Sequence, residues 1–248
     1  MTPFPAADAP LRVIELRRYT LHPGRRDDLI HLFERKFIEP QEALGMRVVG
    51  TFQDLDDPDR FVWLRGFADL SARADALAAF YGGPVWKRYR EDANATMVDS
   101  DDVFMLRPAT ALDSFAQAQS PRAAIDAAPT RPPGLITITL CPLREAADEA
   151  LLRSWNEIVR PAWIGAEGEL LACLVSETAP NNFPRLPVRE GEPVIAWFTR
   201  FADVAAQERH AAFVAANGCL QAPGWAERLA GAPSTTRLVA TPRSALRG

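Results

Sequence analysis

The sequence lacks the paired cysteines that mark disulfide-rich or zinc-binding proteins. Its three cysteines, Cys141, Cys173 and Cys219, are odd in number, lie far apart and form no Cys-x-x-Cys pair. Neither a disulfide framework nor a zinc cluster is therefore indicated. We expect buried, unreactive thiols and a cytoplasmic location.

Histidine is equally scarce, and the common cofactor motifs are missing. His22, His31 and His210 are the only histidines, and none has a His-x-x-x-His or Glu-x-x-His neighbour. The chain contains no Gly-x-Gly-x-x-Gly or Walker-type loop and no Gly-x-Ser-x-Gly elbow. We predict no metal and no cofactor, and expect His210 to be exposed or to pack against a helix instead of binding haem.

An excess of positive charge and a long apolar run are also absent. There are 28 Lys and Arg residues against 32 Asp and Glu, for a net charge of −4, and the arginines are scattered. This pattern argues against a nucleic-acid partner. No apolar run approaches the roughly 20 residues that a membrane span needs, and the N-terminus resembles no signal peptide. The sequence predicts a soluble protein without a membrane span.

What is present is a repeated order of strands and helices. In the first half, period-two alternation predicts strands and helical spacing predicts helices. The order is strand 13–21, a long helix 25–44 that bends or breaks at Pro40, strands 46–54 and 61–67, helices 72–81 and 85–94, and strand 103–106. This is a βαββαβ order, which is typical of a ferredoxin-like module.

The second half repeats that order. It predicts strand 135–143, helix 146–166, strands 169–178 and 194–201, helix 205–216 and strand 235–241. Between the halves lies an Ala/Pro-rich stretch. We predict a first module at 11–108, a linker at 109–133 and a second module at 134–243.

Matching letters strengthen the case for a tandem repeat. The stretch Trp63–Leu70 aligns with Trp197–Val204, and each contains Phe-Ala-Asp before a helix. An isolated ferredoxin-like sheet leaves one apolar face uncovered. We therefore predict an α+β fold of two tandem ferredoxin-like modules, in which each sheet needs a partner for its uncovered apolar face.

The first half also resembles the NIPSNAP family. The resemblance rests on Glu15-Leu16-Arg17-x-Tyr19-Thr20-Leu21-x-Pro23-Gly24, a long helix, Gly45-Met46, a hairpin, and Pro84-x-Trp86-x-x-Tyr89. The second half matches mainly in element order. NIPSNAP proteins belong to the dimeric α/β-barrel superfamily, whose members pair two modules face to face. The resemblance therefore implies that the two modules close a β-barrel of the dimeric α/β-barrel type within one chain, and a homodimer of chains remains open. It does not imply one activity, because one fold serves many functions.

Candidate site residues follow from strand alternation. Glu15, Arg17 and Tyr19 share one face of the first strand, with the apolar Ile14 and Leu16 opposite. We expect the polar face to line the barrel and the apolar face to lie under the helices. If the protein is an enzyme, the resemblance implies cofactor-free chemistry with Glu15 as base, Arg17 or Arg65 stabilising an oxyanion and Tyr19 orienting the substrate.

The third strand of each module adds a tryptophan to this expected lining. Trp63 and Arg65 share one face, and Trp197 and Thr199 share the corresponding face of the repeat. Together these groups suit a small aromatic or apolar ligand, because rings stack and arginine binds carboxylate or enolate oxygens. The leading hypothesis is a NIPSNAP-like protein that binds such a molecule in the barrel.

Other interpretations stay open. The protein could be a cofactor-free monooxygenase or isomerase acting on an activated aromatic, or a non-catalytic stress or interaction protein whose barrel is filled. In the last case Glu15 and Arg17 pair for register and the tryptophans only fill space. The long loop 179–193 is the best candidate lid, or else a surface insertion that packs Phe183 and Leu186.

Overall fold

The computed structural model describes residues 10–110, 113, 115, 120–128, 130, 132–165 and 167–248. The first half of the chain folds in the predicted order. Its elements are β1 (Val13–Leu21), α1 (Arg26–Lys36), α2 (Ile38–Glu42), β2 (Arg47–Asp54), β3 (Arg60–Phe67), α3 (Leu70–Gly82), α4 (Pro84–Asn94), β4 (Met97–Asp99) and β5 (Val103–Pro108). The short strand β4, which pairs with the end of β1, was not predicted.

The second half repeats this order around a π-helix. Its elements are β6 (Leu135–Pro142), α5 (Glu149–Ser154), the π-helix η2 (Trp155–Val159), α6 (Arg160–Ile164), β7 (Glu169–Ser176), β8 (Val194–Phe201), α7 (Val204–Asn217), the short 3₁₀ helices η3 (Cys219–Gln221) and η4 (Ala226–Arg228), and β9 (Ser234–Ala240). The single helix predicted for 146–166 is therefore three consecutive helical pieces, and residue 166 lies outside the described residues.

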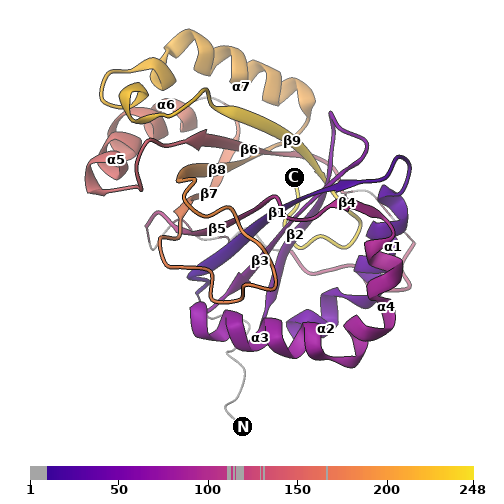
Figure 1. The fold of residues 1–248 in the computed structure, drawn as a ribbon. Helices are drawn as coiled ribbons and strands as arrows, with labels where there is room; N and C mark the ends of the chain where they lie inside the picture. The colour runs from indigo at the N-terminus through magenta and orange to yellow at the C-terminus, as the bar shows by residue number, and fades with distance from the viewer. Residues whose placement is uncertain are drawn as a thin grey trace.

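Eight of the strands close into one antiparallel barrel. Within the first module the order is β2-β3-β1-β5, and within the second it is β7-β8-β6-β9. The final strand of each module then pairs with the second strand of the other, through β9–β2 and β5–β7. Figure 1 shows α1–α4 on one side of the barrel and α5–α7 on another. The predicted fold class is confirmed, while the module boundaries 11–108, 109–133 and 134–243 stay a prediction.

The barrel interior is filled by apolar side chains from both modules. One buried cluster contains alternate residues of β1 and β3 together with those of β6 and β8, including Ile14, Leu64, Ile138 and Phe198. Phe115, from the stretch predicted to be a linker, is 1% exposed and packs edge-on against Phe198 with ring centroids 5.0 Å apart. Interiors of small barrels are commonly filled in this way.

The long helix of the first module breaks before Pro40. The N–H of Phe37 donates to the carbonyl of Phe33, and α2 begins at Ile38. Pro40 therefore lies in the first turn of α2, where backbone N–H groups have no intrahelical partner and a missing donor costs little. The prediction of a break at Pro40 was wrong in position by about one turn.

Twin aspartates begin the corresponding helices α3 and α7. Asp69 accepts a hydrogen bond from the N–H of Ala72, and Asp203 accepts one from the N–H of Ala206, both at 2.8 Å. Asp69→Ala and Asp203→Ala should each lower the free energy of unfolding by about 1 kcal/mol, because a helix N-cap is lost. Urea denaturation would measure this change.

The matched control for this prediction is Asp75→Ala. Asp75 is exposed in the middle of α3 and does not cap the helix. Its replacement by the best helix former should leave stability unchanged or slightly raised. Equal losses in Asp75→Ala and Asp69→Ala would contradict the capping interpretation.

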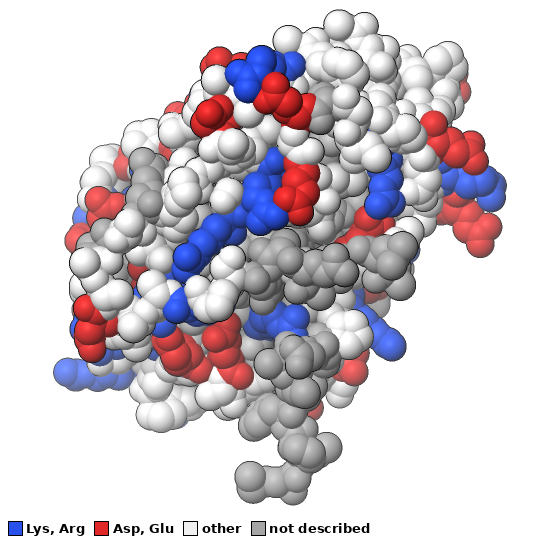
Figure 2. Space-filling view, turned by 180° about the vertical axis from the view of Figure 1, so that it is seen from behind, with Lys and Arg blue, Asp and Glu red and all other residues white. Residues whose placement is uncertain are grey.

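The outer surface carries both signs of charge. On the face seen in Figure 2, basic side chains lie mostly beside acidic ones. Exposed pairs such as Arg237–Asp56 and Arg209–Glu167 contribute to this mixture. Among the described helices, none has both the length and the apolar character that crossing a bilayer requires.

Candidate functional site

The predicted polar face of β1 lies under the helices instead of inside the barrel. Ile14 and Leu16 belong to the barrel interior, whereas Tyr19 and Trp63 belong to the separate cluster between the sheet and α1–α4. The prediction that Glu15, Arg17 and Tyr19 line the barrel is therefore wrong. The barrel interior joins two apolar sheet faces, while the helices provide the polar partners that buried charges need.

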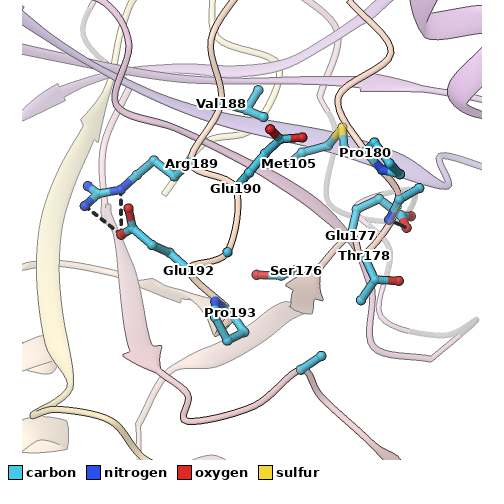
Figure 3. Close-up of a pocket in the computed structure, with 13 residues that line it drawn as sticks. Met105, Ser176, Glu177, Thr178, Pro180, Val188, Arg189, Glu190, Glu192 and Pro193 are labelled. Atoms are coloured by element: carbon cyan, nitrogen blue, oxygen red, sulfur yellow. Dashed lines mark hydrogen bonds and ion pairs between the residues drawn. The ribbon is translucent and has the colours of Figure 1, made fainter. Parts of the chain in front are cut away.

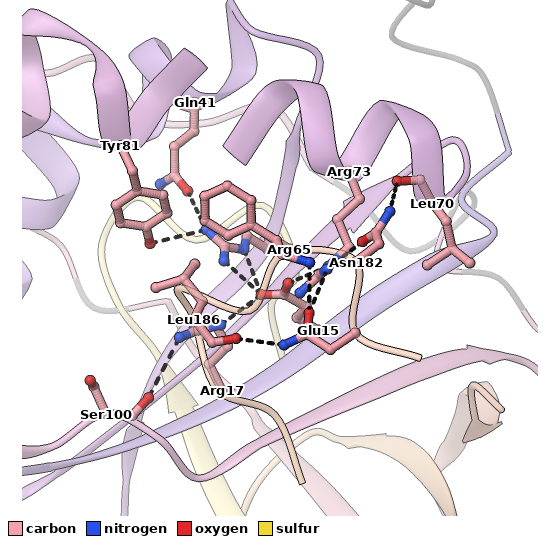
Figure 4. A network of polar contacts seen from close by, with 12 residues as sticks. Glu15, Arg17, Gln41, Arg65, Leu70, Arg73, Tyr81, Ser100, Asn182 and Leu186 are labelled. Atoms are coloured by element: carbon pink, nitrogen blue, oxygen red, sulfur yellow. Dashed lines mark hydrogen bonds and ion pairs between the residues drawn. The ribbon is translucent and has the colours of Figure 1, made fainter. Parts of the chain in front are cut away.

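Glu15 accepts hydrogen bonds from three arginines. Arg17 Nη1 and Arg65 Nε each lie 2.7 Å from its Oε2, and Arg73 Nε lies 2.7 Å from its Oε1 (Figure 4). Glu15 lies directly across from Arg65 in the β1–β3 ladder, and Arg73 comes from α3. None of the four side chains is more than 2% exposed. We call these four residues the arginine cluster.

Tyrosine and amide groups surround this cluster. Arg17 Nε donates to the hydroxyl of Tyr19 at 2.9 Å. Arg65 Nη1 lies 3.3 Å from Gln41 Oε1 and 3.4 Å from the hydroxyl of Tyr81. These contacts satisfy part of the guanidinium donors and leave the tyrosine hydroxyl protons available to another acceptor.

The long loop of the second module closes over the first module's cluster. Arg73 Nη1 donates to Asn181 Oδ1 at 3.1 Å and to Asn182 Oδ1 at 2.7 Å. Phe183 is 9% exposed within the first module's helix–sheet cluster, and Leu186 packs against that cluster. The loop therefore covers the site, and it packs Phe183 and Leu186 as the alternative interpretation expected.

Arg73 was missed by sequence reasoning although a signal existed. It lies on the same stripe of α3 as Leu77 and Phe80, and all three are buried. A charged residue on the apolar stripe of a helix requires a buried partner. Gln41 and the loop asparagines carried no comparable signal.

The arginine cluster holds two positive charges in excess. Burial works to raise the pKa of Glu15, but the guanidinium groups of Arg65, Arg17 and Arg73 outweigh it and hold that pKa well below its usual range. Burial raises the pKa of Tyr19, so its hydroxyl is neutral at pH 7. Three guanidinium groups thus face a single ionised carboxylate.

A small cavity adjoins this cluster. It has a volume of about 30 Å³, enough for one or two water molecules. Tyr19, Gln41, Trp63, Tyr81 and Trp86 carry polar groups, and the remaining lining is apolar: Leu29, Phe33, Phe37, Phe80, Ala93 and Met97. Trp63 Nε1 is buried without a hydrogen-bond partner in the described part of the chain.

Trp197 and Thr199 do not join this group. They lie between the sheet and the helices of the second module, where Trp163 Nε1 donates to Thr199 Oγ1 at 2.9 Å. Trp197 packs against Trp155 with ring centroids 4.6 Å apart. The predicted convergence of both tryptophans is wrong, because the outer faces of the two modules lie on different sides of the barrel.

A larger hollow of about 420 Å³ lies beneath the loop, beside Met105 (Figure 3). Its acidic groups already have partners inside the loop. Glu177 accepts from the N–H of Ala179, Glu190 from the N–H of Asn181, and Glu192 pairs with Arg189 at 2.8 Å. This hollow therefore offers less unsatisfied polar chemistry than the arginine cluster.

The scarce histidines and cysteines form no metal site in the described residues, where no group of three potential ligands occurs. His210 is buried, and its Nε2 lies 3.0 Å from the carbonyl of Trp163. Cys141, Cys173 and Cys219 are free and buried.

Comparison with known proteins identifies the first module. A family model described as NIPSNAP matches residues 14–113. The first module is a NIPSNAP module. A NIPSNAP family protein of unknown function from Agrobacterium tumefaciens strain C58 is 24% identical, over 40% of this chain and 88% of that chain, with a TM-score of 0.37.

Two further structures resemble the NIPSNAP module and its repeat together. An anthrone oxidase-like protein is 15% identical, with a TM-score of 0.55, over 96% of this chain and 95% of that chain. A presumed monooxygenase from Lactobacillus acidophilus NCFM is 10% identical, with a TM-score of 0.52, over 94% of this chain and 98% of that chain. These likenesses concern the fold. No curated protein matches the sequence.

Proposed function

We propose that this protein binds a small aromatic or apolar molecule carrying an anionic oxygen between the helices and the sheet of its NIPSNAP module. The excess of two buried positive charges in the arginine cluster supports this most directly. Buried charges are costly unless they are paired, and an anion would supply the missing charge. The barrel interior, in contrast, is filled by packed apolar side chains.

The adjoining cavity supports the aromatic part of the proposal. Trp63, Tyr81 and Trp86 line it, and the guanidinium carbon of Arg65 lies 5.1 Å from the ring centre of Trp63. Aromatic walls next to arginines suit a flat ring whose charged end meets the guanidinium groups. The cavity of about 30 Å³ is too small for such a ligand, so binding requires the surrounding side chains or the loop to move.

Tyr81→Phe tests this site without removing a charge. Its hydroxyl lies 3.4 Å from Arg65 Nη1 and can donate its own proton to a bound carboxylate. We expect the variant to bind 4-fluorobenzoate about tenfold more weakly, because a hydrogen bond to a charged group is lost. Ligand-observed ¹⁹F NMR would measure the affinity. The uncharged 4-fluorobenzamide should bind more weakly than 4-fluorobenzoate, because it lacks the negative charge.

The control is Tyr89→Phe, which removes the hydroxyl of a tyrosine that does not line this cavity. Arg17→Ala is a second variant, expected to abolish binding while the protein stays folded. Unchanged affinity for the acid in Tyr81→Phe, together with severe unfolding in Arg17→Ala, would make the cluster purely structural and overturn the proposal.

A second candidate function is cofactor-free oxidation of an activated aromatic. The fold likeness to the anthrone oxidase-like protein and to the presumed monooxygenase favours it. Such oxidation begins with removal of a substrate proton, and the depressed pKa of Glu15 makes it a poor base. Oxygen uptake would be measured with anthrone in the presence and in the absence of the protein. Equal rates would argue against this function.

The cellular setting is also part of the proposal. Three free, buried thiols are consistent with a reducing compartment, and we propose a cytoplasmic location. Association of two chains into a homodimer stays a prediction. Native mass spectrometry would test it through the mass of the assembly and would also detect a retained ligand.

A further inference from the structure

The repeat places neutral residues where the first module has its arginine cluster. Aligning Trp63 with Trp197 carries Arg65 onto Thr199, and continuing the same alignment carries Arg73 onto Gln207. Both second-module positions keep their structural setting, because β8 and α7 occupy the places of β3 and α3 in the module. Two guanidinium groups are thus replaced by a hydroxyl and an amide.

The strand pairings extend this correspondence to β6. In the first module Glu15 lies opposite Arg65 in the ladder. In the second module Thr137 lies opposite Thr199, and so takes the place of Glu15. By the same ladders Thr139, opposite Trp197, takes the place of Arg17, opposite Trp63. Each of the four charged positions therefore has an uncharged counterpart.

An open pocket of about 230 Å³ occupies this position in the second module. It lies between α7 and the strands β6 and β9. Its lining residues are all uncharged at neutral pH: Thr137, Thr139, Trp163, Phe201, Gln207, His210, Ala211, Val214, Ala215, Leu220, Gln221 and Thr235. Burial lowers the pKa of His210, which keeps its ring neutral.

The pocket has aromatic walls and a few oriented polar groups. His210 Nε2–H donates to the carbonyl of Trp163, so the neutral ring presents Nδ1 as an acceptor. Thr139 Oγ1 and Thr235 Oγ1 lie 3.1 Å apart and share one hydrogen bond. Trp163 and Phe201 flank His210 with ring centroids 4.8 and 5.1 Å away.

We propose that the second module binds a small uncharged ring compound bearing a hydroxyl group, such as a phenol. The volume suits a single ring, and aromatic walls with a few placed polar groups are typical of ligand pockets. A phenol both donates and accepts hydrogen bonds, which matches threonine hydroxyls and an imidazole acceptor. A carboxylate would lose its hydration here without meeting a cation, so this site selects against anions.

The probe pair is 4-fluorophenol and 4-fluorobenzoate at pH 7, observed by ¹⁹F NMR. Phenols ionise near pH 10 and carboxylic acids near pH 4, so only the second probe is charged. Ala211→Phe fills the pocket from an exposed position of α7 and is expected to weaken phenol binding at least about tenfold. Affinity for the benzoate should stay unchanged.

Ala212→Phe is the matched control, because Ala212 is exposed on the same helix and does not line the pocket. A second variant, Thr139→Val, keeps the shape and removes one hydroxyl, and should weaken phenol binding severalfold. Absence of phenol binding to the unaltered protein, or equal binding by Ala211→Phe and Ala212→Phe, would overturn the proposal. Tyr81→Phe should change only benzoate binding at the first module's site, and Ala211→Phe should change only phenol binding at the second module's site. The two proposals can therefore fail independently.

Discussion

Glu15→Gln is expected to lower the free energy of unfolding by about 3–5 kcal/mol. The change keeps the size of the side chain and removes the carboxylate on which Arg17, Arg65 and Arg73 converge. Three guanidinium groups, each at most 2% exposed, then remain buried. The substitution has removed their counter-charge. Urea denaturation at pH 7 would measure the loss.

The matched control is Glu169→Gln, which breaks a carboxylate–arginine pair at the surface. Glu169 pairs with Arg200, and its side chain is 60% exposed. Exposed pairs contribute about 0–1 kcal/mol, so this variant should remain close to the unaltered protein. A Glu15→Gln loss as small as that of Glu169→Gln would show that the cluster is hydrated or already neutralised by another group.

The same carboxylate gives stability a defined pH dependence. The pKa of Glu15 is depressed in the folded protein and near 4.3 in an unfolded chain, so its stabilising contribution is complete above that unfolded pKa. The contribution is lost progressively as the pH falls from about 5 toward the folded pKa. Unfolding free energies measured between pH 7 and pH 3 should therefore fall less steeply for Glu15→Gln.

Phe198→Ala is expected to destabilise the fold by about 3–5 kcal/mol, because it removes a large ring from the filled barrel. Phe198 is fully buried and packs against Phe115 inside the cluster that both modules share. Benzoate affinity should persist, since the arginine cluster lies outside the barrel. Denaturation and ¹⁹F NMR on the same variant would measure both quantities.

Phe213→Ala provides the comparison for this second change. Phe213 is 42% exposed on α7, so its truncation should cost less than about 1 kcal/mol. A small loss in Phe198→Ala, or loss of benzoate affinity with the fold retained, would mean that the barrel interior is looser than the packing shows and takes part in binding.

The two modules offer complementary chemistry on one scaffold. The first surrounds a carboxylate with arginines beneath a loop from the second module. The second keeps an open pocket without charged lining residues. Duplication of a module allows such divergence, because each copy retains its strand ladder while the outward side chains change.

Local sequence determined most of the secondary structure. The alternation from Val13 to Leu21 gave the bounds of β1 as they stand in the structure. Phe-Ala-Asp indicated a helix start in both halves, and in the structure Asp69 and Asp203 are the N-caps. These features depend on the side-chain period, 2.0 residues in a strand and 3.6 in a helix, and on neighbouring residues in the sequence. Both can be determined from the sequence alone. The resemblance to NIPSNAP proteins, together with the repeat, then implied closure of two sheets into a barrel.

Only the tertiary structure decided which face of each strand is inside. Alternation in β1 separates Glu15 and Arg17 from Ile14 and Leu16, but both faces are buried. The apolar face meets the other module, and the charged face meets α3 and the loop, which supply Arg73 and the asparagines. Arg73 lies 58 residues from Glu15 in the sequence, and Asn182 lies 109 residues from Arg73. A period-two pattern determines which side chains share a face of the strand. What each face contacts depends on segments that are distant in sequence and meet only in the folded protein.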